Sequence, residues 1–280
     1  MNELNIKDKV AVITGGAGVI CSAMARSLAY HGVKCAIIDL NEEAAVSMAE
    51  EIVSESGVKA IGVAADVLDK ASLIAAKQAV NKKLGPVDIL VNGAGGNSPA
   101  GTTKVEKMTG ADDENMEDTF FGLKIEGFDK VFNINFKGTV IPTMVFASDM
   151  VGRKSGVIIN ISSMNSYRPL TKIAAYSAAK AAVNNFTQWL AVHFSKTGVR
   201  VNAIAPGFLL TNQNRFLLID EKTGGPTPRG LKVINGTPME RYCAPEELTG
   251  TLLYLASDLS RFVTGVVIPV DGGFSAYSGV

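Results

Sequence analysis

Short apolar runs rich in β-branched residues alternate along this protein with longer stretches whose apolar residues recur at helical spacing. The runs are nearly continuous in apolar residues, as in strands that helices cover on both faces, and each is followed by Gly, Asn, Asp or Ser. The pattern predicts an α/β fold with a doubly wound, mostly parallel seven-stranded sheet in a single domain of residues 1–280. The predicted strands are KVAVITG, KCAIIDL, KAIGVAADV, VDILVNGAG, GVIINISS, VRVNAIAPG and VVIPVDGG, and the predicted helices are 19–31, 42–56, 70–84, 126–151, 174–197 and 245–257.

Two segments break this alternation and are expected over the carboxyl edge of the sheet, where open α/β folds bind their ligands. Residues 96–125 form a polar insertion that contains Gly, Thr and Asp. Residues 208–240 contain several Gly and Pro residues and are predicted to be a substrate lid, because long loops in compact domains often close over ligands. The alternative is that both are surface insertions without a function.

Size and charge narrow the range of partners. The protein has 280 residues, of which 47% are hydrophobic, so it can bury one large core. Lys plus Arg and Asp plus Glu both total 27, and this balance points to small molecules or further copies of the protein rather than to nucleic acid. The first ten residues lack the apolar run of a secretory signal, and the longest apolar stretches are strand-sized. We therefore expect a cytoplasmic protein without a membrane segment.

Cysteine and histidine are too sparse for a disulfide framework or a metal site. The three cysteines, Cys21, Cys35 and Cys243, are far apart in the sequence, and His31 and His193 are the two histidines. We expect buried, unreactive thiols and no metal.

The candidate catalytic residues are Ser163, Tyr176 and Lys180. Ser163 closes a predicted strand, and the YSAAK segment places Tyr176 and Lys180 at positions i and i+4, on one face of a predicted helix. A phenol has a pKa of about 10, and a nearby ammonium lowers that pKa, which favours proton exchange with an alcohol or carbonyl oxygen. Tyr30 and Lys34 have the same spacing, but no serine-bearing strand precedes them, so we interpret that match as accidental.

A glycine cluster after the first predicted strand indicates a nucleotide site. Gly15, Gly16 and Gly18 lie at the turn before a helix, where a backbone approaches a pyrophosphate closely. Asp39 ends the second strand, where a carboxylate accepts hydrogen bonds from an adenine-side ribose and repels a 2′-phosphate, which favours NAD over NADP. The alternatives are that Asp39 caps the next helix and that Asp66, after the third strand, forms a turn rather than an adenine contact.

These segments together resemble the short-chain dehydrogenase/reductase family over essentially the whole sequence. The resemblance rests on TGGAGVIC, ADV, NGAG, NINFKG, ISS, YSAAK, NAIAPGFLLT and VDGG, which occur in the family's order. It implies a Rossmann-like NAD(P)-binding fold and hydride transfer from a nicotinamide cofactor.

Within this family, the sequence is similar to the D-mannonate oxidoreductases (fructuronate reductases) of the short-chain type. The similar segments are GGAGVICSAMA, the insertion after NGAGGN, NISSMNSYRPLTKIAAYSAAKAAVNNFTQWLAVH, GFLLTNQNR and DGGFSAYSG. That likeness implies reversible reduction of the C5 ketone of D-fructuronate to D-mannonate.

The resemblance also implies roles for individual residues. Tyr176 would donate a proton to the forming alkoxide, and Lys180 would lower the tyrosine pKa and hold the nicotinamide ribose. Ser163 would bind the substrate oxygen, and Asn135 would hold a water that links Lys180 to solvent. The expected cofactor contacts are Gly15, Gly16, Gly18, Val19, Ile20, Asp39, Asp66, Val67, Asn92, Ala94, Gly95, Tyr176, Lys180, Pro206, Gly207 and Thr211.

Two features depart from the family pattern. Val19 and Cys21 occupy positions that are usually glycine, and Asn92 with Gly93 replaces the usual paired asparagines. Val19 adds a side chain close to the expected path of the phosphates, which affects the expected cofactor geometry.

A sugar acid also needs a group that recognises its carboxylate. Arginine suits this best, because its planar guanidinium forms two charge-assisted hydrogen bonds. Arg168, in the loop after the catalytic strand, and Arg215, at the start of the lid, are the candidates, although either is equally well explained as a solvated surface residue. Asn165 is a candidate for binding substrate hydroxyls, as are Asn97 and Asn214, although loop asparagines most often serve turns.

Trp189, Phe186 and Leu190 form an apolar stripe on the helix that carries YSAAK, which is typical of a core or a subunit interface. Since the resemblance implies pairing of subunits through this helix, we expect a homotetramer.

Two other functions of the protein stay open. One is a reductase of another ketone, such as 5-ketogluconate or an acyl-carrier-bound 3-oxoacyl thioester. The other is a non-catalytic NAD-binding regulator, which would not need the Asn, Ser, Tyr and Lys set.

Overall fold

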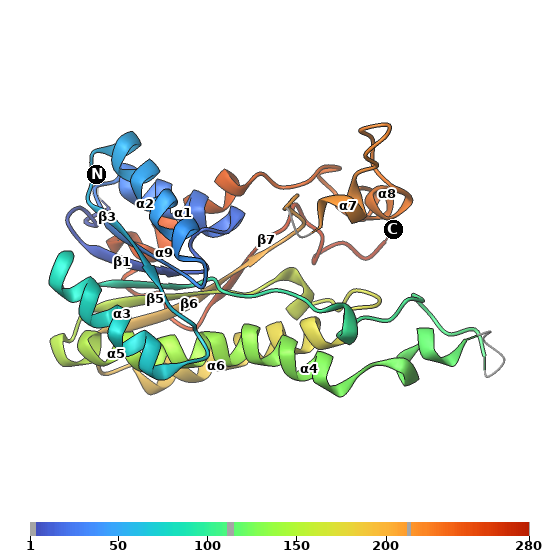
Figure 1. Ribbon diagram of the computed structural model, residues 1–280, viewed down its shortest axis with the longest axis horizontal. Helices are drawn as coiled ribbons and strands as arrows, with labels where there is room; N and C mark the ends of the chain where they lie inside the picture. Colours follow the sequence, from blue (N-terminus) through green and yellow to red (C-terminus); the bar gives the residue numbers. More distant parts are fainter. Residues whose placement is uncertain (1–3, 111–114, 212–213, 280) are drawn as a thin grey trace.

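The computed structural model describes residues 4–110, 115–211 and 214–279. Within them, seven parallel strands form one sheet in the order β3-β2-β1-β4-β5-β6-β7, and the predicted doubly wound α/β fold is confirmed. Figure 1 shows this sheet between layers of helices. Residues 111–114 of the insertion and 212–213 of the lid lie outside the described residues. The strands are β1 (Val10–Thr14), β2 (Lys34–Asp39), β3 (Ala60–Ala64), β4 (Ile89–Asn92), β5 (Gly156–Ile161), β6 (Val199–Pro206) and β7 (Val267–Val270).

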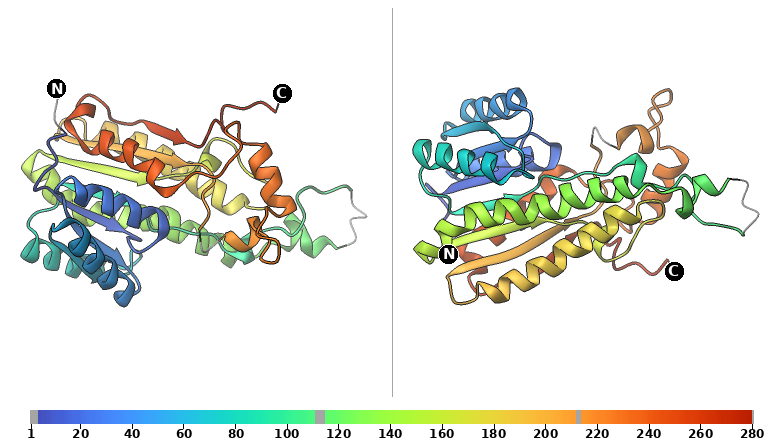
Figure 2. Two further views of the ribbon diagram at one scale, coloured as in Figure 1. Left: turned by 90° about the horizontal axis from the view of Figure 1, so that it is seen from above. Right: turned by 60° about the horizontal axis from the view of Figure 1, so that its bottom comes forward.

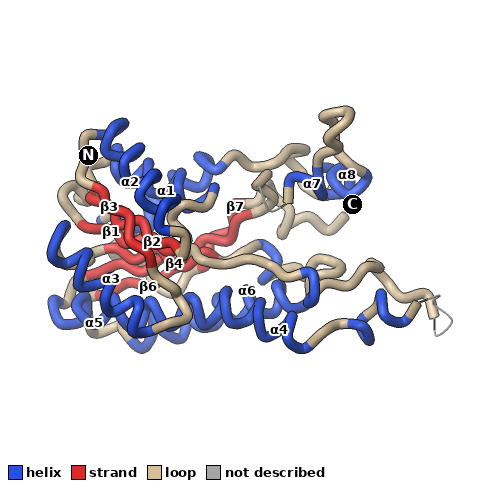
Figure 3. The backbone as a smooth tube through the Cα atoms, in the orientation of Figure 1, coloured by secondary structure: helices blue, strands red, loops and turns tan. Residues whose placement is uncertain are grey.

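Helices cover both faces of this sheet, with α1, α2 and α9 on one face and α3, α5 and α6 on the other (Figures 1 and 3). The helix α4 lies against α6. The described helices are α1 (Val19–Tyr30), α2 (Glu42–Ser56), α3 (Lys70–Lys83), α4 (Ile125–Phe132), α5 (Gly138–Arg153), α6 (Ala174–His193), α7 (Arg215–Leu218), α8 (Pro228–Asn235) and α9 (Thr249–Ala256).

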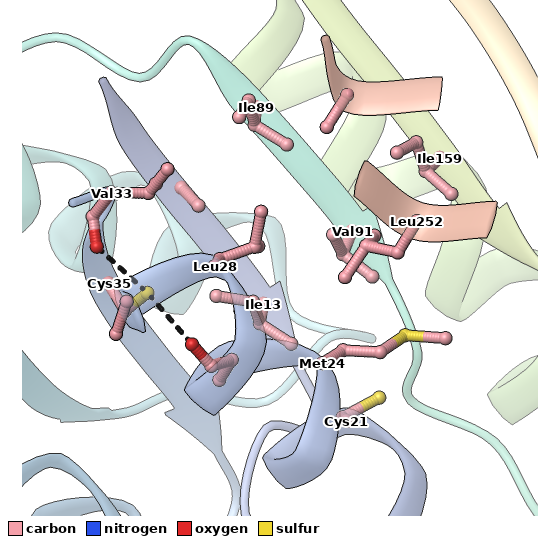
Figure 4. Close-up of a cluster of buried hydrophobic side chains, with 14 of the residues drawn as sticks. Ile13, Cys21, Met24, Leu28, Val33, Cys35, Ile89, Val91, Ile159 and Leu252 are labelled. Atoms are coloured by element: carbon pink, nitrogen blue, oxygen red, sulfur yellow. Dashed lines mark hydrogen bonds between the residues drawn. The ribbon is translucent and has the colours of Figure 1, made fainter. Parts of the chain in front are cut away.

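The strands are continuously apolar because each face of the sheet buries its own core. In β1, Ile13 packs into the cluster beneath α1 and α9, which Figure 4 shows together with Leu28 and Leu252. Val12, the residue before Ile13, points to the opposite face and packs with Phe146 of α5. Successive side chains of a strand alternate between faces, so both must be apolar when helices cover both.

The single helix predicted over 126–151 is interrupted in the structure. Between α4 and α5 the residues Asn133–Lys137 form a π-helical turn. The side chains account for this break: the Asn135 amide donates to the Val131 carbonyl at 2.8 Å, and the Thr139 hydroxyl donates to the Asn135 carbonyl at 2.8 Å. Side chains that hydrogen-bond nearby carbonyls in this way compete with regular helical bonding.

The two irregular segments hold more local structure than their sequences indicate. The segment 208–240 contains α7 and α8, and the Thr227 hydroxyl joins them by donating to the Leu217 carbonyl at 2.7 Å. The segment 96–125 forms short 3-10 turns and projects beyond the carboxyl end of the sheet (Figures 1 and 2). An ion pair of 2.9 Å between Lys232 of α8 and Glu106 links the two segments.

Candidate active site

Two neighbouring elements bring the predicted catalytic side chains together. Ser163 follows β5 at the carboxyl edge of the sheet, and the first turns of α6 carry Tyr176 and Lys180. The Ser163 hydroxyl lies close enough to the Tyr176 phenol for a hydrogen-bonding interaction that lowers the pKa of the phenol. The Lys180 ammonium lies 5.7 Å from the centre of the Tyr176 ring and donates to the Ile161 carbonyl at 2.8 Å. The structure therefore groups the tyrosine, the lysine and the serine as the sequence predicts.

Burial sets the protonation of this cluster. It raises the pKa of the Tyr176 phenol above its ordinary value, and the hydrogen bond with Ser163 offsets part of that rise. It lowers the pKa of the Lys180 ammonium to about 8. The net shift of the tyrosine pKa is therefore upward, because desolvation opposes the charged form of the phenol and Lys180 is not among the causes that lower this pKa. A phenol that keeps its proton is suited to act as an acid in a reduction.

Asn135 lies behind this cluster, inside the π-helical turn, and its side chain is fully buried. Its amide group donates to the Gly96 carbonyl at 2.7 Å, and its amide oxygen accepts from the Gly96 backbone at 3.3 Å. A side chain at Gly95 would approach the Asn135 oxygen to 2.7 Å and the Lys180 ammonium to 3.4 Å. Asn135 thus holds the segment after β4 against Lys180, at a position where only glycine fits.

A groove of about 470 Å³ lies at the carboxyl ends of β1 and β4, where the order of the strands in the sheet reverses. Open α/β folds bind dinucleotides at this kind of position. Gly15 at its base has a φ of +62°, and a Cβ there would lie 2.9 Å from the Ala94 Cα, so the close approach of the two loops requires glycine. The predicted cofactor residues that line the groove are Gly15, Gly18, Val19, Ile20, Asp39, Asp66, Val67, Ala94, Gly95 and Thr211.

Asp39 faces the groove from the end of β2. Its carboxylate accepts from the Ala17 backbone at 3.3 Å and from the Asn41 backbone at 3.2 Å. The side chain that caps α2 belongs to Asn41, which accepts from the Ala44 backbone. Asp39 is therefore not the cap of that helix, and its carboxylate is positioned to meet a ligand in the groove.

Two predicted cofactor residues lie elsewhere. Asn92 is buried, and its amide donates to Thr143 at 2.9 Å and to Asn160 at 2.8 Å, so it joins β4 to α5 and β5 rather than lining the groove. Gly16 lies beneath the groove, where a Cβ would meet Ile37 at 2.8 Å. Both residues support the site from behind instead of lining it.

The two departures from the family pattern fit each other. Cys21 is buried on α1, and a Cβ at Gly93 would lie 2.1 Å from its sulfur, far inside van der Waals contact. The side chain gained at position 21 thus occupies the space that a side chain at position 93 would need. Burial raises the pKa of the Cys21 thiol to about 12, so the thiol stays protonated.

A second cleft, of about 340 Å³, adjoins the groove and contains Ser163, Tyr176 and Lys180. Pro206 and Gly207, predicted as cofactor contacts, also line it. Its remaining polar lining includes Asn97, Ser162, Asn165, Thr211 and Asn214. The Asn165 side chain is only 6% exposed, and its amide oxygen has no hydrogen-bond partner within the described part of the protein. Such a buried acceptor suits a ligand hydroxyl.

The arginines differ from the prediction. The Arg168 guanidinium donates to the Ser275 carbonyl at 2.9 Å, Arg215 is exposed, and neither lines the cleft. The expectation that one of them faces the substrate is therefore wrong. Arg229 of α8 lines the cleft instead. The sequence contains one indication of this position. Thr227 and Pro228 are typical of a helix start, and they place Arg229 in the first turn of that helix.

Other features of the described residues bear on chemistry. Among them, no group of three or more His, Cys, Asp or Glu could hold a metal ion, and no helix is both long and apolar enough to cross a membrane. Cys35 is buried, and this burial raises its pKa to about 12, whereas Cys243 is only partly buried.

Comparisons with known proteins identify the family of this protein. The family model described as short chain dehydrogenase matches residues 9–222. UxuB of Bacillus subtilis (strain 168), an uncharacterized oxidoreductase, is 52% identical over 277 residues, which cover 99% of this protein and 98% of UxuB. A 2-dehydro-3-deoxy-D-gluconate 5-dehydrogenase from Formosa agariphila is 30% identical over 98% of this protein and 96% of its own length.

A solved Haemophilus influenzae structure with bound NAD, described as a candidate D-mannonate oxidoreductase, superposes with a TM-score of 0.91 at 51% identity, covering 99% of this protein and 98% of that one. The family match spans most of the sequence, and the relatives span nearly all of it. This protein therefore belongs to the short-chain dehydrogenase family.

Proposed function

We propose that this protein is an NAD-dependent oxidoreductase that reversibly reduces the C5 ketone of D-fructuronate to D-mannonate. The observation that carries the proposal is the Ser163, Tyr176 and Lys180 cluster, which lies in a cleft that adjoins the dinucleotide groove. The Haemophilus influenzae relative, with bound NAD and a described link to D-mannonate, supports both the cofactor and the substrate.

Each of these residues of the cleft would have its own role in the reaction. Bound NADH would supply the hydride to the ketone carbon. Tyr176 keeps its proton through burial and gives it to the ketone oxygen as that oxygen gains negative charge. The Ser163 hydroxyl orients the oxygen, and the Lys180 ammonium stabilises the phenolate that remains. Asn135 keeps Lys180 in place through the segment at Gly95.

Asp39 supports the choice of NAD. Its carboxylate lines the groove at the end of β2, where it is placed to accept hydrogen bonds from ribose hydroxyls and to repel a 2′-phosphate. The insertion 96–125 and the lid 208–240 contribute Asn97, Asn214 and Arg229 to the cleft, and we propose that the lid closes over the substrate within a single domain.

Two alternatives are less well supported. An acyl-carrier-bound substrate would favour a basic docking surface, and the formal net charge of zero gives that alternative no help. A regulator without turnover would not need Ser163, Tyr176 and Lys180 to be grouped as they are. Reduction of a related sugar acid is the nearest competitor, because the Formosa agariphila relative acts on a deoxygluconate.

The direct test is a substrate panel. Oxidation of NADH and of NADPH would be followed with D-fructuronate, D-tagaturonate, 5-ketogluconate and a simple diketone. We expect the highest kcat/KM for D-fructuronate with NADH. Absence of D-fructuronate reduction, or a clear preference for another ketone, would contradict the proposed substrate. A preference for NADPH would contradict the role of Asp39.

A further inference from the structure

We propose that Arg229 binds the substrate carboxylate and makes the enzyme selective for sugar acids over neutral sugars. This inference rests on the proposed function, because it identifies the anchor for the acid group of a sugar-acid ketone. It starts from the charge of the cleft. Among the described residues that line it there is no Asp or Glu, and Lys180 and Arg229 are its cations. A cleft with this lining attracts an anion.

The two cations are not equally available. The Lys180 ammonium is buried, donates to the Ile161 carbonyl and lies beside Tyr176, so it belongs to the proton-transfer cluster. The Arg229 side chain is partly buried and forms no hydrogen bond or ion pair with any residue that the structure describes. Its planar guanidinium can therefore offer two parallel hydrogen bonds to one carboxylate.

A nearby acid does not neutralise Arg229. Glu106 is near enough to interact electrostatically with Arg229, but its carboxylate is paired with Lys232 at 2.9 Å. The pKa of Glu106 is lowered mainly by that pairing, with smaller contributions from Lys172 and Arg229. Glu106 thus interacts with three cations, and its ion pair is with Lys232 rather than with Arg229.

The backbone at Arg229 is held firmly although its helix end is a poor place for a cation. Arg229 lies in the first turn of α8, where the helix dipole opposes positive charge. The Thr227 backbone donates to the Leu218 carbonyl at 2.9 Å, and a Cβ at Gly230 would lie 2.2 Å from that same oxygen. An arginine at this position does not stabilise the start of α8. Ligand binding, by contrast, accounts for a cation here.

The location also suits the substrate. In D-fructuronate the carboxylate and the C5 ketone lie near opposite ends of the carbon skeleton. Tyr176 approaches the cleft from α6 and Arg229 from α8, which belong to separate parts of the molecule (Figure 1). A substrate that places its ketone at Tyr176 can extend its acid group toward α8, past the unpartnered oxygen of Asn165.

The test compares charged and uncharged forms of one substrate. Arg229→Gln, Arg229→Lys and wild type would be assayed with D-fructuronate and with D-fructuronamide, which lacks the negative charge. We expect Arg229→Gln to raise the KM for D-fructuronate by about 10- to 100-fold, with little change in kcat and little effect on the amide. Arg229→Lys should recover part of the loss. Arg261→Gln, at an exposed arginine outside the cleft and outside the proposed lid, is the control and should match wild type.

Equal effects of Arg229→Gln on both forms, or no effect, would overturn the inference while leaving the proposed reaction intact. If wild type reduces no D-fructuronate, the proposed function fails, and calorimetry with D-mannonate and D-mannitol in the presence of NAD⁺ still decides the role of Arg229. If wild type binds D-mannonate more tightly than D-mannitol and Arg229→Gln loses this preference, the result would support Arg229 as the anchor for the acid group. Equal binding of both by wild type would reject it.

Discussion

At the scale of single residues, the buried ammonium of Lys180 lowers the stability of the folded protein at neutral pH. Burial lowers its pKa to about 8, so at neutral pH the folded protein holds a desolvated ammonium. The unfolded protein binds the proton more strongly between pH 8 and the ordinary lysine value of 10.5, and the free energy of unfolding should therefore rise with pH across that window.

Replacement of Lys180 by Met removes this charge. We expect Lys180→Met to raise the free energy of unfolding at pH 7 by about 1–3 kcal/mol, because no ammonium is then buried. The same variant should lose nearly all activity and the rise of stability above pH 8. Urea unfolding at several pH values measures both effects. A less stable variant at pH 7 would show that the bond to Ile161 outweighs the desolvation of the charge.

Cys21 and Gly93 form a second residue-scale case, in which two positions depend on each other. Gly93→Ala should lower the free energy of unfolding by about 1–3 kcal/mol, because its Cβ would overlap the Cys21 sulfur. Cys21→Ala in the same protein should recover part of that loss, since it removes the sulfur. Thermal unfolding of the single and double variants gives the coupling energy. The matched control is Cys35→Ala, another buried thiol, which should not rescue Gly93→Ala. Additive effects of the first pair would exclude the coupling.

At the scale of elements, the lid depends on close backbone packing between α7 and α8. A Cβ at Gly230 would lie 2.2 Å from the Leu218 carbonyl and 2.9 Å from the Tyr242 hydroxyl. Gly230→Ala should therefore displace α8 and raise the KM for the ketone several-fold, with a smaller change in the melting temperature. Gly152→Ala on α5 is the control, because nothing lies within 4 Å of the added atom and alanine favours the helix. Unchanged KM in Gly230→Ala would show that α8 does not position the substrate.

The elements also show how far the sequence alone could lead. The seven strands were predictable because burial on both faces of the sheet imposes continuous apolar runs. The helix α6 was predictable because its apolar residues recur at helical spacing. The π-helical turn at Asn135 was not, because a break caused by side chains that take backbone carbonyls leaves no periodic signal. The helices α7 and α8 are too short for their period to stand out, so Arg229 was missed.

The candidate site, too, could be predicted from the sequence only in part. Ser163, Tyr176 and Lys180 were predictable because their spacing fixes them on one strand end and one helix face. The arginine choice was wrong because Arg168 and Arg229 are both loop-adjacent in sequence, and only packing decides which of them faces the cleft. The raised tyrosine pKa depends on burial, which spacing does not report.

At the scale of the whole molecule, exposed aromatic side chains support the proposed homotetramer. Trp189 is 56% exposed on the outer face of α6 and stacks on His193, with ring centres 4.8 Å apart. Leu190 packs in the core, so the predicted stripe is buried in one part and exposed in another. Figure 2 shows α5 and α6 side by side, and Met144 of α5 is also exposed on that layer. Apolar surface of this kind is typical of an interface between subunits.

Trp189→Glu should dissociate the assembly, because it places a charge in the proposed interface. Sedimentation velocity at micromolar concentration should give a tetramer for wild type and smaller species for the variant. Tyr30→Glu changes an equally exposed aromatic residue at the end of α1 and should leave the assembly intact. A monomeric wild-type protein would contradict the proposal.

We propose that Tyr176 is the proton donor for hydride transfer beside a bound nicotinamide. The most direct measurement is the turnover of Tyr176→Phe with D-fructuronate, made together with a titration of NADH binding by fluorescence. We expect turnover to fall by at least about 100-fold, the order expected when a general acid is lost, while the affinity for NADH stays close to that of wild type. A variant that binds NADH and still reduces the ketone at the wild-type rate would contradict it.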